Sequence, residues 1–288
     1  MAESHFFDAP LLQGAEGETH RMHYQTWGDA AKPALFCVHG LTRNSHDFDL
    51  ITEALSKDYF VICPDIAGRG ESEYLADVSN YNYVAYMSDC IALAGHLGIQ
   101  QCDWIGTSMG GIIGMMTAAL NPQFIRKLVI NDIGFIVPSA ALKAICDYAA
   151  NPPRFTSREE GESYLREIQS GFGIDDPALW QRFFDSSLIE DGGEWRLNYD
   201  PNILEPVRRE TDDFKTIQDI DLTELWQPVA CPILLLRGAD SEILPVETAA
   251  MMRQDKAKLD FIEVPNCGHA PHLMNDEQIG WVKEWLLG

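Results

Sequence analysis

Basic residues and long hydrophobic runs are both scarce in this sequence. Its 288 residues include 21 Lys and Arg against 44 Asp and Glu, which gives a net charge of −23. A protein this acidic repels phosphate backbones and anionic lipids, so we expect no nucleic-acid partner and no binding to a membrane surface. The longest apolar stretch, Gly111 to Leu120, is far shorter than the roughly 18 residues that suggest a membrane span.

Paired cysteines and a secretory leader are also missing. The seven cysteines stand far apart, and the opening residues MAESHFFDAP have no basic segment followed by an apolar core. These features predict a reduced, cytoplasmic protein. The acidic surplus fits either an ordinary solvated surface or a salt-rich habitat, because salt screens the repulsion between like charges.

The sequence does contain a series of short apolar runs that alternate with helical patterns. Runs buried on both faces and separated by helices predict an α/β protein with a mostly parallel sheet. Thr19–Trp27 alternates more and predicts an antiparallel strand at the edge of that sheet. The other predicted strands are Ala34–Val38, Tyr59–Cys63, Cys102–Ile105, Lys127–Ile130, Ile233–Leu236 and Asp260–Val264. The predicted helices are Phe48–Leu55, Tyr83–Leu97, Met109–Leu120, Val246–Gln254 and Glu277–Leu287.

The alternation of strands and helices stops between residues 133 and 227. This segment has no buried-strand run, and its short helical patterns cover Ala140–Tyr148, Glu159–Gln169 and Ala178–Asp185. A structureless loop of that length is uncommon inside a compact domain. We therefore expect a core formed by residues 1–132 and 228–288, with residues 133–227 inserted as a helical cap.

The strongest local motif is the G-x-S-x-G sequence from Gly106 to Gly110. It follows a predicted strand and opens a predicted helix, so Ser108 stands at a sharp turn that needs small neighbours two residues away on each side. The helix N-terminus favours negative charge developing at the serine. The sequence therefore predicts Ser108 as a nucleophile. The alternative is a glycine-rich turn with an incidental serine.

A nucleophilic serine needs a base and an oxyanion hole. His269, in the stretch NCGHA after the last predicted strand, is the predicted base, with His272 as its neighbour. His39 ends the first parallel strand and is predicted to make structural hydrogen bonds. The amides of Leu41 and Met109 are predicted to form the oxyanion hole.

Four motifs in this order resemble those of the α/β-hydrolase superfamily. They are HGLT at 39–42, D-x-x-G-x-G-x-S at 65–72, GTSMGG at 106–111 and CGHAPHL at 267–273. The resemblance runs from about Thr19 to the end of the chain, apart from the cap. It implies an α/β-hydrolase fold: an eight-stranded, mostly parallel sheet with helices on both faces and a helical cap inserted after strand six. It also implies Ser–His–acid hydrolysis without a cofactor. A metal pair formed by His269 and His272 is an alternative that we do not expect, because the sequence has no H-E-x-x-H motif and no cysteine cluster.

The acid is where the sequence departs from that family. Most relatives carry an aspartate three residues after the glycine that ends the seventh strand, but here that position holds Ser241, flanked by Asp240 and Glu242. Some branches place the acid at the end of the sixth strand, where this chain has Asp132. We predict Asp132 as the acid and keep Asp240, then Glu242, as alternatives.

The predicted activity is hydrolysis of carboxylic esters through an acyl-enzyme on Ser108. The apolar helix after the serine and the cap aromatics Phe155, Phe172, Trp180 and Phe183 suggest a pocket for an uncharged group, although the aromatics are equally explained as the core of the cap. The alternatives are a carbon–carbon hydrolase of ring-cleavage products, a lactonase, and a binding protein with the hydrolase fold. The expected partner is a small-molecule ester, and the expected assembly is a monomer or homodimer.

Overall fold

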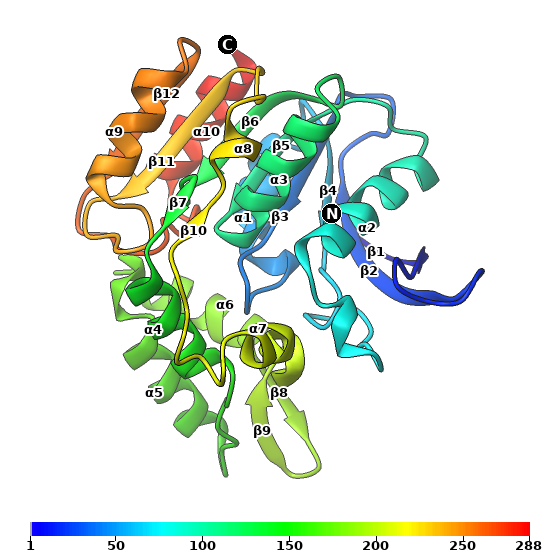
Figure 1. The fold of residues 1–288 in the computed structure, drawn as a ribbon, viewed down its shortest axis with the longest axis vertical. Helices are drawn as coiled ribbons and strands as arrows, with labels where there is room; N and C mark the ends of the chain where they lie inside the picture. Colours follow the sequence, from blue (N-terminus) through cyan, green and yellow to red (C-terminus); the bar gives the residue numbers. More distant parts are fainter. Residues whose placement is uncertain (1) are drawn as a thin grey trace.

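A single eight-stranded sheet organises the molecule. The computed structural model describes residues 2–288, and its strand order across the sheet is β1-β2-β4-β3-β5-β6-β11-β12 (Figure 1). The strands are β1 (Glu3–Pro10), β2 (Thr19–Trp27), β3 (Ala34–Val38), β4 (Phe60–Pro64), β5 (Cys102–Thr107), β6 (Ile125–Asn131), β11 (Ile233–Gly238) and β12 (Leu259–Val264). The prediction of an eight-stranded, mostly parallel sheet is therefore confirmed.

The expected position of Thr19–Trp27 at the edge of the sheet is wrong. This strand, β2, is antiparallel as predicted, but it lies between β4 and β1, and β1 forms the edge. Strand β1 alternates half-buried or buried positions with exposed ones. Such a strand lacks the continuous apolar run that marks the interior strands, because one of its faces remains in water.

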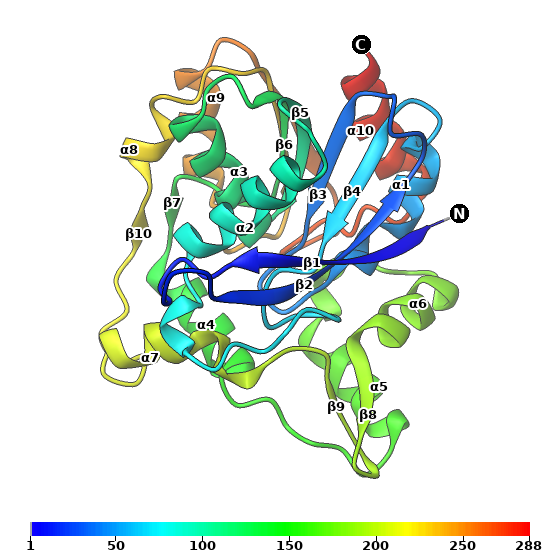
Figure 2. The ribbon, with the colours of Figure 1, turned by 90° about the vertical axis from the view of Figure 1, so that its right-hand side faces the viewer.

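Helices cover both faces of the sheet (Figures 1 and 2). Alternate residues of a strand point to opposite faces, so Leu35 and Cys37 pack against one helical layer while Phe36 and Val38 pack against the other. The first layer contains α1 (Asp49–Leu55) and α10 (Asp276–Leu287). The second contains α2 (Tyr83–His96), α3 (Met109–Leu120) and α9 (Val246–Asp255).

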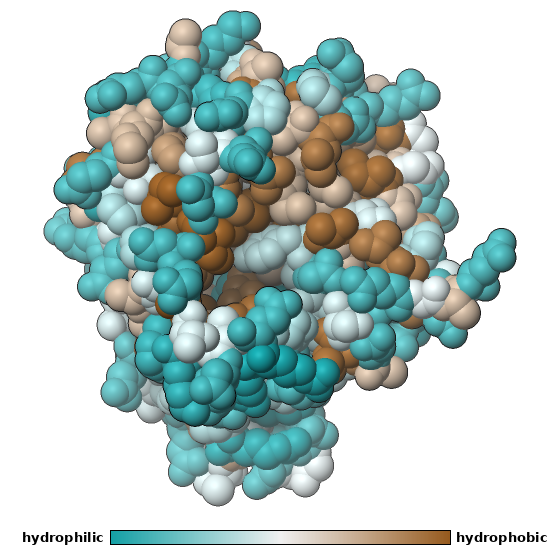
Figure 3. Space-filling model, viewed as in Figure 1, coloured by the Kyte–Doolittle hydropathy of each residue, from teal (hydrophilic) through white to brown (hydrophobic). Residues whose placement is uncertain are grey.

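Residues 133–227 connect β6 to β11, and most of this segment lies beyond the ends of the strands (Figure 2). Its helices are α4 (Ser139–Ala149), α5 (Arg158–Ile168), α6 (Pro177–Ser187), α7 (Glu205–Glu210) and α8 (Thr223–Trp226). A hollow lined mainly by hydrophobic side chains opens between this segment and the sheet region (Figure 3).

The sequence suggested that this segment contains no strands, but the structure shows four short ones. It contains β7 (Ile136–Val137) paired with β10 (Ile220–Asp221), and a hairpin of β8 (Leu188–Asp191) and β9 (Glu194–Leu197). These strands are two to four residues long and only partly buried, so they produce no long apolar run. Between residues 2 and 288, no helix is long and apolar enough to cross a membrane, and all seven cysteines are free thiols.

Candidate active site

Ser108 stands at the turn between β5 and α3. Its backbone has φ 51° and ψ −111°, an unusual conformation for a residue with a side chain. A Cβ at Gly106 would lie 2.2 Å from the carbonyl oxygen of Gly110, and a Cβ at Gly110 would lie 1.9 Å from that of Val38. The turn is therefore sterically closed to larger residues, which is why the motif has glycine two residues before and after the serine.

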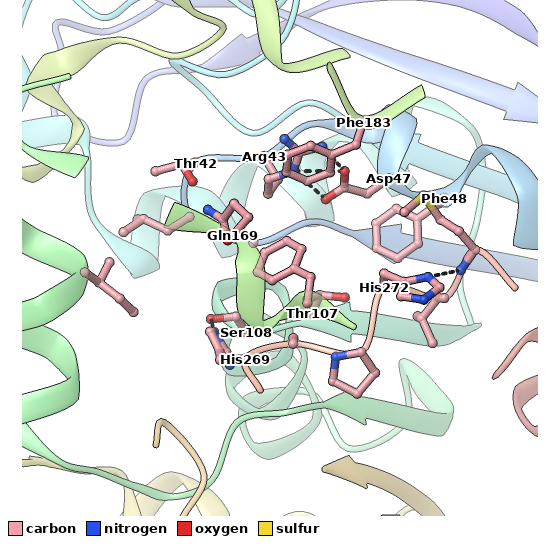
Figure 4. Close-up of a pocket in the computed structure, with 18 of the residues that line it drawn as sticks. Thr42, Arg43, Asp47, Phe48, Thr107, Ser108, Gln169, Phe183, His269 and His272 are labelled. Atoms are coloured by element: carbon pink, nitrogen blue, oxygen red, sulfur yellow. Dashed lines mark hydrogen bonds and ion pairs between the residues drawn. The ribbon is translucent and has the colours of Figure 1, made fainter. Parts of the chain in front are cut away.

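His269 reaches this serine from the loop that follows β12. Its Nε2 lies 2.8 Å from the Ser108 Oγ, and the two side chains point toward one another at one end of a small cavity (Figure 4). The imidazole side chain is 20% exposed. The preceding residue, Gly268, donates its amide proton to the Gly171 carbonyl, which ties the histidine loop to the 133–227 segment.

Asp132 lies on the other side of the imidazole. Its Oδ2 is 2.7 Å from the His269 Nδ1, and its Oδ1 accepts the amide proton of Gly238 at 2.8 Å. The residue follows the last position of β6, has φ 58° and is fully buried. The structure thus brings Ser108, His269 and Asp132 together in one hydrogen-bonded chain from three separate strand ends.

The two alternative acids do not join this chain. Asp240 and Glu242 are exposed, and within residues 2–288 neither makes a hydrogen bond to His269. Ser241 between them is buried, and its hydroxyl donates to Asp132 Oδ2 at 2.6 Å. A carboxylate oxygen can only accept, so the hydroxyl is the donor of this bond, and the same Oγ accepts the amide proton of Leu244 at 3.1 Å.

Ser241 therefore contacts the site from the position where most relatives carry their aspartate. The sequence signalled the departure but not the contact, since nothing in it showed that the Ser241 hydroxyl would face Asp132. Three donors, from Gly238, Ser241 and His269, therefore hold the Asp132 carboxylate in one orientation.

The predicted oxyanion amides border the same serine. A side chain at Gly40 would come within 3.8 Å of the Ser108 Cβ, so the loop after β3 lies against the turn. Met109 is the first residue of α3, and an amide in a first helical turn has no acceptor inside its helix. The backbone of Leu41 is also held on its carbonyl side, because the Leu41 carbonyl accepts a proton from the Arg69 Nε at 2.8 Å.

His39 is buried and fully engaged with the backbone. Its Nδ1 donates to the Gly40 carbonyl at 2.7 Å, and its Nε2 accepts the Ile66 amide proton at 3.0 Å. Burial lowers the pKa of His39 to about 4. The ring is neutral at pH 7 and braces the loop that carries Leu41.

His272 lies apart from the hydrogen-bonded chain. Its Nδ1 accepts the Met274 amide proton at 3.0 Å, and burial lowers its pKa to about 4. Among the residues that the structure describes, no three His, Cys, Asp or Glu side chains gather in a way that could hold a metal ion.

The four aromatics of the segment divide between two roles. Phe172 and Phe183 line the small cavity beside His269, with their ring centroids 5.7 Å apart. Trp180 packs against Phe183, and Phe155 packs against a tyrosine of α5. The aromatics thus build the interior of the segment, and two of them also border the site.

Comparisons with known proteins agree on one family. The sequence model of the alpha/beta hydrolase family matches residues 35–279. The 3-hydroxybutyrate-oligomer hydrolase of Cupriavidus necator is 40% identical over 275 residues, covering 93% of this chain and 94% of that protein. The sn-1-specific diacylglycerol lipase ABHD11 of Mus musculus is 27% identical over 85% of this chain and 78% of its own length. The crystal structure of an alpha/beta hydrolase from Novosphingobium aromaticivorans superposes with a TM-score of 0.88 at 31% identity, covering 99% of this chain and 98% of that one.

Proposed function

Because this chain belongs to the alpha/beta hydrolase family and is a hydrolase, we propose that it cleaves carboxylic esters through an acyl-enzyme on Ser108. The observation that carries the proposal is the continuous chain from the Ser108 Oγ through the His269 ring to the Asp132 carboxylate. In this chain the serine sits on a strained turn at a helix N-terminus, where its hydroxyl is presented to a substrate.

In the proposed mechanism, His269 accepts the Ser108 proton as the serine oxygen attacks the ester carbonyl. Asp132 holds the imidazole by its Nδ1 proton and stabilises the imidazolium that forms. The Leu41 and Met109 amides bind the tetrahedral oxyanion. His269 then returns the proton to the leaving alcohol, and water attacks the acyl-enzyme by the same route.

We assign residues 133–227 the role of a cap over this site. The segment supplies Phe172 and Phe183 to the small cavity and contacts the histidine loop through Gly171 and Gly268. Its exit from the core directly follows Asp132.

A sulfonyl fluoride or an organophosphate tests the nucleophile directly. We expect one equivalent of label on Ser108, identified by peptide mass spectrometry, together with complete loss of esterase activity. Ser108→Ala should take up no label. Inactivation accompanied by label on another residue would refute the assignment.

Oligomers of a hydroxy acid are the second candidate substrate. The support is the similarity to the Cupriavidus necator 3-hydroxybutyrate-oligomer hydrolase, which matches almost the whole chain. A panel containing simple esters, 3-hydroxybutyrate dimer and trimer, a lactone and a ring-cleavage dienoate separates these activities. Turnover of the dienoate alone would favour a carbon–carbon hydrolase, and no turnover with no burst from an activated ester would favour a binding protein.

A further inference from the structure

Two cavities of unequal size meet at Ser108. The larger has a volume of about 390 Å³ and the smaller about 70 Å³. Leu41, Ser108 and Ile145 line both of them, so the serine lies at their junction. A substrate attacked by Ser108 can therefore extend into both cavities.

The larger cavity is hydrophobic and extends along α3 from Met109, away from His269, which lines the smaller cavity. Met109 and Ile112 of α3 form its floor, and Leu142 of α4 faces it from the cap. The hydroxyls of Tyr81 and Tyr86 at its wall are already bonded to Asp200 and Arg69. Its other apolar lining residues include Ile133, Val137, Ile203, Leu204, Ile217 and Ile243.

Charge is almost absent from this larger cavity. Among its lining residues in the described chain, Glu210 is the one acidic or basic side chain, and it is exposed. An anionic group buried there would lose its hydration without gaining a cation. The cavity thus suits an uncharged apolar group.

The smaller cavity lies on the side of His269. Residues 270–274, which follow this histidine, line it together with Phe172 and Phe183. Its charged side chains are mutually compensated, because the Arg43 Nε donates to Asp47 at 3.0 Å and the guanidinium lies 3.8 Å from the Phe183 ring centroid. Little room remains beside the imidazole for a long chain.

We propose that the larger cavity binds the acyl part of the ester and the smaller one the leaving alcohol. This assignment rests on the proposed acyl-enzyme mechanism, in which His269 gives its proton to the leaving oxygen. The leaving group must therefore be next to His269, and the acyl chain extends to the other side of the serine, over Met109 and Ile112. The substrate class is an ester of a bulky, uncharged, apolar acid with a compact alcohol.

Two isomeric esters test the assignment without a change of composition. Methyl nonanoate and octyl acetate contain the same atoms but place the long chain on opposite sides of the scissile bond. We expect kcat/KM to be at least about tenfold higher for methyl nonanoate, since discrimination of a well-fitting apolar group reaches this range. An equal or higher value for octyl acetate would overturn the assignment while leaving the ester-hydrolase function intact. If neither ester is hydrolysed, the ester activity fails and this assignment fails with it.

Variants on either side of the serine sharpen the test. Leu142→Trp fills the larger cavity from the half-buried face of α4 and should lower kcat/KM for methyl nonanoate about tenfold. Phe172→Ala widens the smaller cavity and should instead raise kcat/KM for octyl acetate. Leu120→Trp, the same substitution at a position 63% exposed at the end of α3, is the matched control and should leave the ratio of the two esters unchanged. If Leu142→Trp affects octyl acetate more than methyl nonanoate, the two cavities are assigned the wrong way round.

Discussion

Residues 2–288 contain two Ser–His–Asp hydrogen-bonded chains, and they are alike in most of their geometry. In the second chain, the Ser4 Oγ lies 2.9 Å from the His23 Nε2, and the His23 Nδ1 lies 2.7 Å from Asp65. The corresponding distances through His269 are 2.8 and 2.7 Å. The Asp65 carboxylate also accepts two backbone amide protons, from Ser45 and Glu71.

The two chains differ in what surrounds the serine. Ser4 is exposed on the edge strand β1, in a regular antiparallel ladder with β2, whereas Ser108 occupies a strained turn at a helix N-terminus beside two cavities. A hydroxyl on an edge strand has no convergent amides to stabilise an oxyanion. We therefore propose that only the first chain is catalytic and that the second holds β1 and β2 to the loop of residues 65–72. The comparison teaches that a correct acid–imidazole–hydroxyl spacing does not by itself make an active site.

The serines give the largest expected contrast. Ser108→Ala should lower kcat on the order of 10⁶-fold, the size expected when the nucleophile of such a triad is lost. Ser4→Ala should leave kcat within about twofold. Steady-state hydrolysis of an activated ester measures both values of kcat. A large loss of kcat in Ser4→Ala would contradict the proposal that the Ser4 chain is not catalytic.

The acids should separate catalysis from stability. Asp132→Asn should lower kcat about 10⁴-fold while the protein remains folded, because the imidazole loses the partner that fixes its tautomer. Asp65→Asn should leave kcat within a few-fold but lower the free energy of unfolding by about 3 kcal/mol, because it breaks a buried charge pair.

Urea unfolding followed by circular dichroism provides the folded-state check for both variants. Asp240→Asn is the control for the acid. If Asp240→Asn lost most of its kcat while Asp132→Asn kept most of its own, the acid would be the residue after β11.

Acid should destabilise the protein in two stages. His39 has a pKa of about 4 in the folded state against about 6.5 in an unfolded chain, so the unfolded state binds more protons between these values. This pKa difference contributes about 3 kcal/mol to the free energy of unfolding. The contribution is complete above pH 6.5 and is lost as the pH falls to 4.

The stabilising contribution of Asp65 is lost at a lower pH than that of His39. Burial raises the pKa of its carboxyl, but the hydrogen bond and charge of His23 outweigh burial, and the net pKa is lowered. Its contribution is present above about pH 3.9, the unfolded value, and is lost as the pH falls through the folded pKa. Unfolding free energies measured from pH 3 to 8 test both stages. His272 also has a pKa lowered to about 4 by burial and contributes over the same pH range, so His39→Gln should reduce the upper stage without abolishing it and should leave the lower stage in place. A wild-type profile that is level from pH 6.5 to 4 would contradict the assignment.

The smallest expected effect concerns Ser241. Ser241→Ala removes one of three donors to Asp132 and should lower kcat/KM about threefold to tenfold, the range of a single hydrogen bond. Without that donor, the Asp132 Oδ2 keeps only its bond to the His269 Nδ1 and holds the imidazole less firmly. Ser72→Ala is the matched control, since Ser72 is a buried serine bonded to the Asp65 carbonyl. An unchanged kcat/KM in Ser241→Ala would reduce this serine to a packing residue.

Strand–helix alternation and the glycine pattern predicted the core sheet and the place of Ser108. Strand β1 was missed because half of it faces water. The β8–β9 hairpin did carry a signal, because Gly192 and Gly193 both have positive φ and form the two-residue Gly-Gly turn that joins such strands. The pairing of β7 with β10 and the contact of Ser241 with Asp132 join residues more than eighty positions apart, and no local pattern encodes them.

The place where residues 133–227 leave the core has a consequence for protein engineering. Asp132 is the last residue before this segment, and its side chain is anchored to Gly238, the last residue of β11, which is the first strand after the segment. An exchange of caps between related hydrolases must therefore keep the Asp132 backbone in its left-handed conformation and keep Ser241 opposite it. We propose Asp132 as the acid, and on that assignment the junction and the acid are the same residue, so cap diversity and catalytic competence have to be selected together.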